Sequence, residues 1–495
     1  MTLSTQPALR LDQVFTINGV PEVTFVQPSR WNTLLSNLQT PGRGLVIEGP
    51  SGIGKTTAVK QALAQLGHAG AAQILSARRA ADLELIRLLP EMNGFGFVVV
   101  DDFHRLDDDA KASLADLLKT LADDESTDSK LVVVGINRAG ETLIHHAPDV
   151  ANRLDRLRME VEPSGKIAEM ISKGEAALNI SLRSRDGIVE GAHGSFYLAQ
   201  LLCSEACSEA GVLSAAPEHV NIELPYATVR RNVVERVSSV FDPVFTKFAR
   251  GTKFRPGGRA PYLQILTWLS EADSWTIALD EEMRQHPKAR ASVTVVMKNG
   301  YLANLVADPD VRGVFHLDQQ TKVLAIEDPQ AAFYLRSLSL PDFAKRVGFR
   351  SIEFTTSYDV ALSFAGEDRP MAEALNDELE ERGLVVFYDH TEQARILGED
   401  LERFFEPIYS AEADFVVVVL GPSYGQKRWT RFESDAFEER FDQGHVIPIW
   451  SKLVPEVIWD KSKSRGGMTF DPAGDLRSQA SKIAELVAEK VTTSS

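Results

Sequence analysis

The glycine-rich run GPSGIGKT at residues 49–56 has the residue types and spacing of a phosphate-binding loop. It fits the pattern G-x-x-x-x-G-K-[ST], in which glycines let backbone N–H groups wrap a phosphate. Lys55 is placed to reach the β- and γ-phosphates and Thr56 to ligate Mg²⁺. A purely structural turn is the alternative, but the run lies between a strand pattern and a helix pattern. The predicted ATP-binding residues are Gly49, Pro50, Ser51, Gly52, Ile53, Gly54, Lys55, Thr56 and Thr57.

Two aspartates, Asp101 and Asp102, follow a second apolar run. Asp101 is placed to hold Mg²⁺ together with Thr56. Asp102 stands where fast ATPases carry Glu, and its shorter side chain reaches less far towards an attacking water, so we predict slow hydrolysis. Asn137 and Arg138 end a third apolar run and could sense the γ-phosphate, although surface residues after a strand are the alternative.

A carboxylate, Glu433, lies within an apolar stripe of a predicted helix near the C-terminal end. The polar face already holds five other side chains. A carboxylate in this position either pairs at the stripe's edge with Lys427 or Arg440, or lines a cleft where it can stabilise a developing positive charge. The stripe consists of Trp429, Phe432, Ala436 and Phe437.

The elements that position the first group of residues form an α/β pattern. Residues 44–66 predict strand, turn and helix, and 95–106 and 130–138 contain further Val-rich strands. Continuous apolar strands separated by helices indicate a parallel sheet covered on both faces. Residues 1–43 combine short β-like pieces with a helix pattern, and residues 150–240 are predicted to be mainly helical.

The middle of the chain changes pattern from residue 241. Helices are predicted over 260–272, 276–285 and 289–306, followed by a hairpin that turns at residues 318–320. Three helices and a hairpin are typical of a winged helix. Lys288, Arg290 and Lys298 in the third helix are accompanied by valines, which argues against DNA binding.

A second α/β pattern begins at residue 358. It predicts a small flavodoxin-like, five-stranded parallel sheet, four of whose strands are placed at 358–364, 384–389, 414–421 and 445–450. The fold class is therefore multidomain α/β. The predicted domains are 1–240 (phosphate-binding ATPase with its lead-in and helical lid), 241–340 (winged helix), 341–357 (connector) and 358–495 (second α/β domain).

Composition limits the partners and the compartment that we expect for this chain. The 495 residues carry a net charge of −17, which argues against a protein that coats nucleic acid. No apolar run approaches the ~20 residues of a membrane span, and the N-terminus lacks a secretory signal. Cys203 and Cys207 lie one helical turn apart, which suggests that both side chains serve helix packing. A chain with only two cysteines also fits a reducing cytoplasm.

Residues 20–340 resemble the STAND ATPases, the class that includes the NACHT and NB-ARC switches. The segment TFVQPSRWNTLL (24–35) is similar to their nucleotide-base segment, VVVDDFHRL to their Asp-Asp motif, and GINR to their sensor strand. AHGSFYLAQLL (192–202) is similar to their Gly-x-Pro-Leu-Ala helix start, with Phe196 replacing Pro. In that class a winged-helix His contacts ADP. His316 is the candidate here, and a surface position on the wing is the alternative.

Residues 358–490 resemble a TIR domain. YDVALSFAGEDR matches its opening strand and loop, FYD (387–389) its second strand, and SYGQKRWTRFE a segment whose Glu follows Trp by four residues. The resemblance implies that Glu433 is catalytic in NAD⁺ cleavage. It further implies an NAD⁺ site formed by Phe364, Ala365, Gly366, Arg369, Asp389 and Trp429. Arg369 could instead cap its helix or pair with Glu373, and Asp389 could simply end its strand.

Together the two resemblances imply a prokaryotic NLR-like antiphage defence protein. ATP or ADP with Mg²⁺ would control self-association through the ATPase and TIR domains, and NAD⁺ would be the substrate. The trigger could be a phage protein, a nucleic acid or a partner encoded nearby. A non-catalytic TIR scaffold and a DNA-handling ATPase are the alternatives.

Overall fold

The structure is a computed structural model that describes residues 8–136, 143, 151–256, 258–349, 356–389, 401–424, 440, 443–454 and 466–494. The chain divides into two compact units. Unit 1 comprises Met1–Val244, Trp268–Leu279 and Pro309–Ser337, and unit 2 comprises Phe245–Thr267, Asp280–Asp308 and Leu338–Ser495. The domain boundaries drawn from the sequence stay a prediction.

The predicted parallel sheet around the glycine-rich run is confirmed. It has five parallel strands in the order β2-β3-β4-β1-β5. The sequence patterns identified β1, β3 and β4 but missed β2 and β5, which are short and partly polar. The strands are β1 (Gly44–Glu48), β2 (Gln73–Ser76), β3 (Gly96–Asp101), β4 (Ser129–Gly135) and β5 (Leu154–Arg158).

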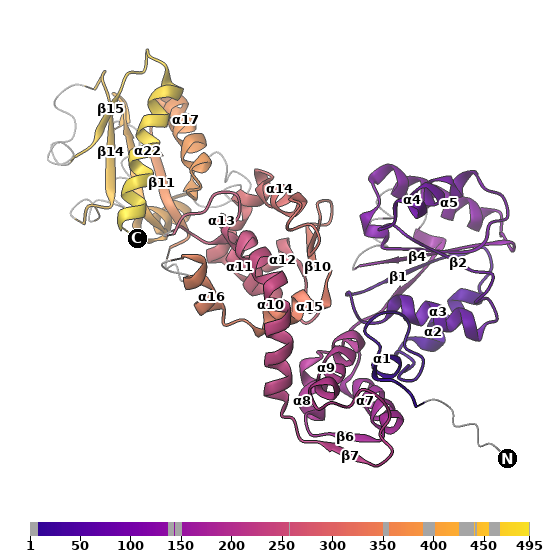
Figure 1. The fold of residues 1–495 in the computed structure, drawn as a ribbon. Helices are drawn as coiled ribbons and strands as arrows, with labels where there is room; N and C mark the ends of the chain where they lie inside the picture. Colours follow the sequence, from indigo (N-terminus) through magenta and orange to yellow (C-terminus); the bar gives the residue numbers. More distant parts are fainter. Residues whose placement is uncertain are drawn as a thin grey trace, which may run out of the picture. The chain divides into compact units, whose positions relative to one another are not determined.

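Helices cover both faces of this sheet, because alternate strand residues point to opposite sides. Val99 and Val132 pack with α2 (Trp31–Gln39) and α3 (Lys55–Gln65) on one face. Their strand neighbours Val98 and Val133 pack with α4 and α5 on the other face. Figure 1 shows this three-layer arrangement. The second pair of helices is α4 (Ala80–Leu88) and α5 (Asp108–Asp123).

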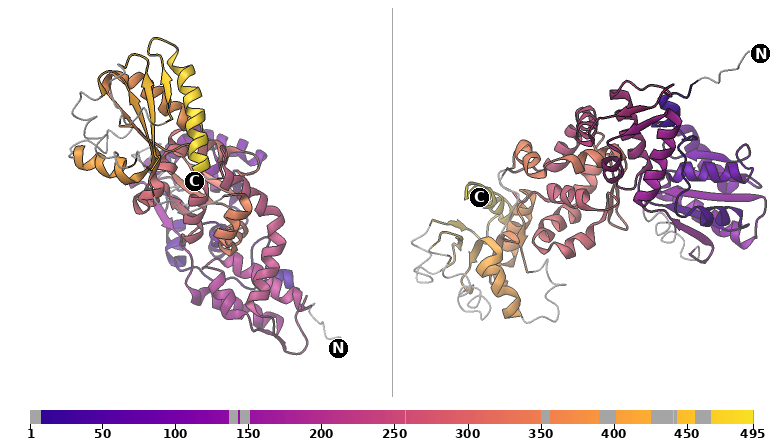
Figure 2. Two further views of the ribbon diagram at one scale, coloured as in Figure 1. Left: turned by 90° about the vertical axis from the view of Figure 1, so that its left-hand side faces the viewer. Right: turned by 90° about the horizontal axis from the view of Figure 1, so that it is seen from below.

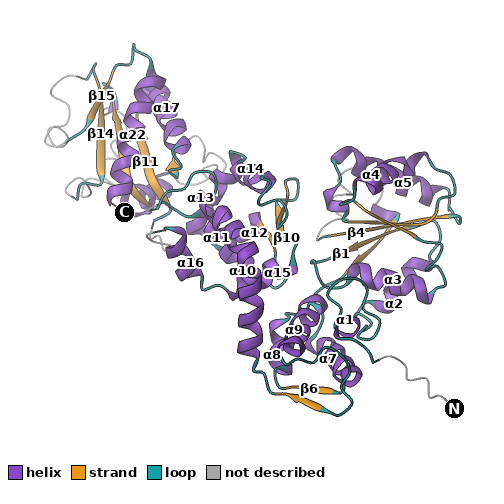
Figure 3. Ribbon diagram, in the orientation of Figure 1, coloured by secondary structure: helices purple, strands orange, loops and turns teal. Residues whose placement is uncertain are grey.

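The rest of unit 1 up to residue 244 is mainly helical, as predicted. Cys203 and Cys207 are buried in α9, and burial raises the pKa of both thiols. Of the short β-like pieces predicted before residue 43, residues 8–43 contain one isolated bridge, from Arg10 to Ser214, and no strand. Figure 3 distinguishes the small β6–β7 pair from the helices beside it. The elements are α1 (Leu11–Val14), α7 (Ser164–Leu178), β6 (Ile180–Leu182), α8 (Arg185–Gly191), α9 (Phe196–Glu209), β7 (Val220–Ile222) and α10 (Tyr226–Arg250).

The middle segment contains the predicted hairpin, β9 (Phe315–Asp318) and β10 (Val323–Ile326), which pair antiparallel. Two expectations were wrong. Thr276–Ala278 is a strand, β8, which pairs with β10, and the third predicted helix breaks at Gly300, whose φ is +69°. The segment predicted as a connector begins with a helix, α16. The helices are α11 (Pro261–Glu271), α12 (Leu279–Gln285), α13 (Pro287–Lys298), α14 (Tyr301–Ala307), α15 (Pro329–Ser337) and α16 (Leu340–Val347).

The second predicted parallel sheet is also confirmed, with five strands in the order β12-β11-β13-β14-β15. Helices α17 and α22 pack on one face, and α19 with the π-helical turn Ile408–Glu412 packs on the other. Figure 2 shows α22 in yellow and α19 in orange on opposite sides of the strands. The elements are β11 (Tyr358–Phe364), α17 (Arg369–Glu381), β12 (Val386–Phe387), α19 (Leu401–Pro407), β13 (Ala413–Leu420), β14 (Val446–Ser451), β15 (Met468–Phe470) and α22 (Leu476–Ser494).

Two details of this unit differ from the sequence expectation. The second strand is only two residues long, and the helix expected over 399–413 ends at Pro407, where the π-helical turn begins. In the part of the chain that the structure describes, every helix is too short or too polar to cross a membrane.

Candidate functional site

The glycines of the 49–56 loop are required by close packing. Gly49, Gly52 and Gly54 all have positive φ, which side chains disfavour. A Cβ on Gly49 would lie 2.1 Å from the carbonyl oxygen of Met159, and one on Gly52 would lie 2.5 Å from Cγ of Pro329. The loop therefore wraps tightly at the carboxyl end of β1, with α3 beginning at Lys55.

The structure brings the predicted phosphate and Mg²⁺ residues together. Lys55 Nζ donates to the carbonyl oxygens of Gly49 (2.8 Å) and Pro50 (2.7 Å). Burial lowers the pKa of Lys55 to about 8, partly opposed by Asp101 and Asp102. Thr56 Oγ1 donates to Asp101 Oδ2 at 2.8 Å. A hydroxyl and a carboxylate are ligands that Mg²⁺ accepts, so these two groups fit a cation held mainly by nucleotide phosphates and water.

Asp102 is engaged by its own neighbours. Its backbone has φ +58°, an uncommon value for a non-glycine residue. Ser76 Oγ donates to Asp102 Oδ2 at 2.9 Å, and Arg78 Nε lies 2.9 Å from the same oxygen. Neither Ser76 nor Arg78 was among the predicted site residues. Their contacts draw the second carboxylate towards β2 and leave Asp101 as the carboxylate bonded to Thr56.

Glu327, which follows β10, is a buried acceptor for three basic side chains at this end of the site. It accepts from Arg105 Nε at 3.1 Å and from Arg78 Nη2 at 3.3 Å, and His104 Nε2 lies 2.9 Å from its Oε1. Its side chain is 3% exposed. Burial alone would raise the pKa of Glu327, but the bonds from His104 and Arg105 outweigh burial and lower the pKa to about 2.

This shift predicts acid sensitivity of unit 1. The carboxyl group takes up a proton near its usual pKa of 4.5 in the unfolded chain but only near pH 2 in the folded protein. The ion pairs therefore stabilise the fold fully above pH 4.5, and the stabilisation, about 3 kcal/mol, is lost as the pH falls towards 2. Glu327→Gln should lower the unfolding free energy at pH 7 by that amount and flatten its pH dependence below 4.5, measured by thermal unfolding across pH.

A matched control is Glu235→Gln. Glu235 is 70% exposed and pairs with Arg231 one helical turn away, so its loss should change stability by less than about 0.5 kcal/mol. An equal loss for Glu327→Gln at pH 7 and at pH 2.5 would contradict the assignment of the acid response to this group.

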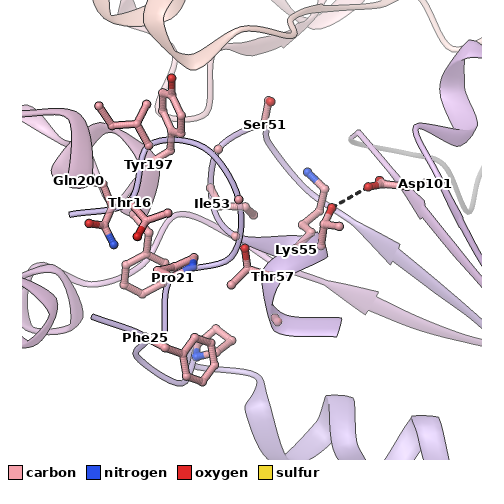
Figure 4. Close-up of a pocket in the computed structure, with 18 of the residues that line it drawn as sticks. Thr16, Pro21, Phe25, Ser51, Ile53, Lys55, Thr57, Asp101, Tyr197 and Gln200 are labelled. Atoms are coloured by element: carbon pink, nitrogen blue, oxygen red, sulfur yellow. Dashed lines mark hydrogen bonds between the residues drawn. The ribbon is translucent and has the colours of Figure 1, made fainter. Parts of the chain in front are cut away.

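A cavity of about 230 Å³ extends from these groups. Its walls include Phe25 and Val26 from the predicted nucleotide-base segment, residues 24–35. They also include Phe196 from residues 192–202, the predicted start of the lid helix, which we call the lid start. Figure 4 shows Gln200 and Phe25 on the side of the cavity away from Lys55 and Asp101. The cavity therefore has a charged phosphate end and a largely apolar end, the shape that a nucleotide requires.

The lid start also touches the glycine-rich loop. Ser195 Oγ donates to the carbonyl oxygen of Gly52 at 3.0 Å, and the Tyr197 N–H donates to the same oxygen at 3.2 Å. His316, the candidate for an ADP contact, is absent from the described cavity lining. It is half-buried, its ring centroid lies 4.9 Å from that of His104, and burial lowers its pKa to about 4.

The predicted sensor residues Asn137 and Arg138 lie outside the described residues, as do Trp429 and Glu433. Their roles stay predictions.

Unit 2 brings three predicted NAD⁺-site residues together at the carboxyl ends of β11 and β12. Arg369 Nη2 lies 3.3 Å from Asp389 Oδ2, and its guanidinium carbon lies 5.2 Å from the centre of the Phe364 ring. Tyr388, which was not predicted, lies 3.5 Å from Arg369 through its hydroxyl and 5.6 Å from Phe364 between ring centres. The alternative pairing of Arg369 with Glu373 is not the arrangement found.

Ala365 and Gly366, also predicted, form the loop between β11 and α17. Ala365 is buried, whereas Gly366 is exposed. Beside them, Asp368 accepts a hydrogen bond from the Gly421 N–H at the end of β13, and its oxygens lie where a Cβ on Gly421 would be. Burial and Glu367 raise the pKa of Asp368 to about 6.

Arg440 was one of two partners that the sequence offered for Glu433. It is buried and donates to the carbonyl oxygens of Tyr409 (2.9 Å), Ala413 (2.7 Å) and Asp414 (2.6 Å). These carbonyls lie at the amino end of β13, at the edge of the sheet opposite Phe364 and Arg369. Among the described residues Arg440 thus bonds backbone groups, and its predicted alternative pairing with Glu433 lies outside the described residues and stays a prediction.

The first sheet with its glycine-rich loop defines a P-loop nucleotide-binding fold, and the second is a flavodoxin-like parallel sheet with polar groups at its carboxyl edge. Residues 360–477 match the family described as TIR domain. The C-terminal part of the chain is therefore a TIR domain.

Three curated relatives share this part. The 3' cyclic ADP-D-ribose synthase AaTIR of Aquimarina amphilecti is 39% identical over 27% of this chain and 46% of its own length. The 2' cyclic ADP-D-ribose synthase BtTIR of Bacteroides thetaiotaomicron is 32% identical over 21% and 37%. The NAD(+) hydrolase TcpC of Escherichia coli O6:H1 is 32% identical over 21% and 34%. The chain thus spans less than half the length of each relative.

Among solved structures, the ORC2 protein of Aeropyrum pernix in ADPNP–ADP complexes aligns with 68% of this chain and 98% of its own. The sequence identity is 15% and the TM-score 0.35.

Proposed function

We propose that this chain is a nucleotide-controlled enzyme that cleaves NAD⁺ to nicotinamide and an ADP-ribose product through its TIR domain. The main support is the match of residues 360–477 to the TIR family. The curated relatives of this part are named for NAD⁺ hydrolysis or for cyclic ADP-ribose synthesis. The clustering of Arg369, Asp389 and Phe364 at the carboxyl edge of the sheet supports it, since open α/β sheets bind ligands there.

In the proposed reaction the bond between ribose C1′ and the nicotinamide nitrogen breaks, and nicotinamide leaves with the electron pair. The ribose becomes positively charged, as in glycoside cleavage. Glu433 stabilises that cation or orients the ribose hydroxyls. Water, or a ribose hydroxyl in a cyclising enzyme, then adds to C1′ and releases a proton. Arg369 is positioned for phosphate or ribose, and Phe364 for the nicotinamide end.

The P-loop unit would act as a switch. Lys55 and the loop N–H groups would bind the phosphates, and Thr56 and Asp101 would hold Mg²⁺. The bonds from Ser76 and Arg78 to Asp102 support slow hydrolysis, because they engage the carboxylate that would otherwise orient water. A long-lived ATP state suits a switch better than a motor.

Immune function and assembly extend this proposal. ATP would favour self-association through the ATPase and TIR domains, which would complete the TIR active sites, as in an antiphage effector that depletes NAD⁺. The trigger, whether a phage protein, a nucleic acid or a neighbouring-gene partner, is left open, and so is the choice of linear or cyclic product. The cytoplasm is the expected compartment.

The switch predicts a specific defect in Lys55→Ala. Removing the half-buried ammonium should weaken ADP and ATP binding at least about 100-fold, because a charge-assisted bond to phosphate contributes about 1.5–3 kcal/mol and Lys55 would make more than one. Binding is measured by calorimetry on the full chain. NAD⁺ cleavage should also lose its response to ATP.

Lys60→Ala is the matched control. Lys60 is an exposed lysine of the same helix, so its replacement should leave nucleotide binding unchanged. Equal ATP affinity in wild type and Lys55→Ala would contradict the assigned phosphate site. Nucleotide binding without any NAD⁺ cleavage would favour the TIR scaffold, and DNA-stimulated hydrolysis would favour the DNA-handling ATPase.

A further inference from the structure

The apolar end of the unit 1 cavity contains a polar side chain that the phosphate chemistry does not use. Gln200, on the lid helix α9, lines the cavity and is 3% exposed. It lies among apolar groups of the lead-in segment and the lid, including Pro21, Phe25 and Met170. Figure 4 shows it remote from Lys55 and Asp101, at the end where a base would lie if the phosphates occupy the P-loop.

A chain of hydrogen bonds determines which end of the Gln200 amide, the nitrogen or the oxygen, faces Thr24. Thr24 Oγ1 donates its single proton to the carbonyl oxygen of Val14 at 2.8 Å. Thr24 Oγ1 can then only accept from Gln200, and Gln200 Nε2 lies 2.7 Å from it. Turning the amide over would make Thr24 donate to Gln200 instead, and the bond to Val14 would be lost. The chain therefore orients the amide with Nε2 towards Thr24.

The other end of the amide, Oε1, is a buried acceptor without a hydrogen-bond partner in the described part of the chain. An unpaired buried acceptor costs about 1–3 kcal/mol, so such atoms are uncommon in folded proteins. Thr24, the partner of Nε2, is 1% exposed, which makes the orientation rigid. Oε1 is thus a covered acceptor without a donor, on a residue that lines the cavity, while Nε2 keeps one N–H beyond the one that Thr24 accepts.

We propose that Gln200 selects adenine over guanine nucleotides, with Oε1 accepting a hydrogen bond from the exocyclic amine of the base. This inference rests on the proposed nucleotide binding and specifies its ligand. Adenine presents an amine at base position 6, whereas guanine and hypoxanthine present an oxygen, which would face Oε1 without a proton between them. Because Oε1 is covered, α9 and the lead-in segment must part slightly as the base enters.

The test compares the dissociation constants of ADP, GDP and inosine diphosphate, measured by calorimetry on the full chain. Inosine diphosphate differs from ADP only at base position 6 and in the proton on N1. Wild type should bind ADP at least about 10-fold more tightly than the other two, as expected when a buried polar group is left unpaired by the wrong ligand. Gln200→Met should reduce this ratio to about 1.

The ratio, not the absolute affinity, is the readout, because Gln200→Met also removes the bond to Thr24. Gln61→Met is the matched control: Gln61 Nε2 donates to the Pro21 carbonyl oxygen at 3.4 Å, and its loss loosens the same segment without removing Oε1. It should keep the wild-type ratio. Equal affinity of wild type for all three nucleotides, or an unchanged ratio in Gln200→Met, overturns this inference alone. Failure to bind any nucleotide overturns the proposed nucleotide switch as well.

Discussion

Glu433→Gln is expected to lower the rate of nicotinamide release by about 1000-fold while leaving the protein folded. The substitution keeps the side chain's shape but removes the negative charge that would face the developing ribose cation, and the loss of one such preorganised group costs about this much. The rate is measured by chromatography of nicotinamide released from NAD⁺ by the full chain.

The matched control is Glu438→Gln. Helical periodicity places Glu438 on the polar face of the same predicted helix, so its replacement changes the net charge equally without touching the proposed cleft. Activity should stay within about 2-fold of wild type, as for surface substitutions in general. Equal losses in both variants would show that the helix, and not the Glu433 charge, is what matters.

Arg259→Met is expected to destabilise unit 2 by about 3–5 kcal/mol, the cost of leaving a buried charge without its partner. Arg259 is 4% exposed and its Nε lies 2.8 Å from Asp359 Oδ1, where Asp359 is 6% exposed. It also contacts Asp414 at 3.2 Å and bonds Thr356. The arginine comes from the loop between α10 and α11, and its partners lie beside the first residues of β11 and β13.

The effect is measured by chemical unfolding of the full chain, with hydrogen exchange of β11 amides as the local readout. Lys452→Met is the control, since Lys452 is 61% exposed in its 3.4 Å pair with Asp471 and should contribute less than about 1 kcal/mol. Adding Asp359→Asn to Arg259→Met should restore part of the loss, because no uncompensated carboxylate then stays buried. Unaltered β11 exchange in Arg259→Met would contradict the assignment.

Much of the fold was predictable because its signals are local. The glycine-rich loop, the Val-rich strands β3 and β13 and the strand-helix alternation each occupy a short window of sequence. Strands β2, β8 and β15 were missed because each has only three or four residues, too few for a periodic pattern. The break at Gly300 was missed because two apolar helices in succession look like one.

The site was only partly predictable, and the reason is sequence separation. The P-loop residues are contiguous. Arg369, the first residue of α17, and Asp389, two residues after β12, are 20 residues apart. Glu327 bonds Arg78 across 249 residues, and Gln200 bonds Thr24 across 176. No spacing rule links such residues, because the sheet and lid bring them together only after folding. Glu327 could have been noticed only as a charged residue directly after an apolar strand.

The central claim is that this chain breaks the bond between nicotinamide and ribose. The direct test is mass spectrometry of NAD⁺ incubated with the purified full chain in the presence of ATP and Mg²⁺, or of ADP and Mg²⁺, with phage lysate as the source of a trigger. The account predicts equimolar nicotinamide and an ADP-ribose product, formed faster with ATP than with ADP and absent in Glu433→Gln. Intact NAD⁺ in every nucleotide state, from protein that binds ATP, would contradict it.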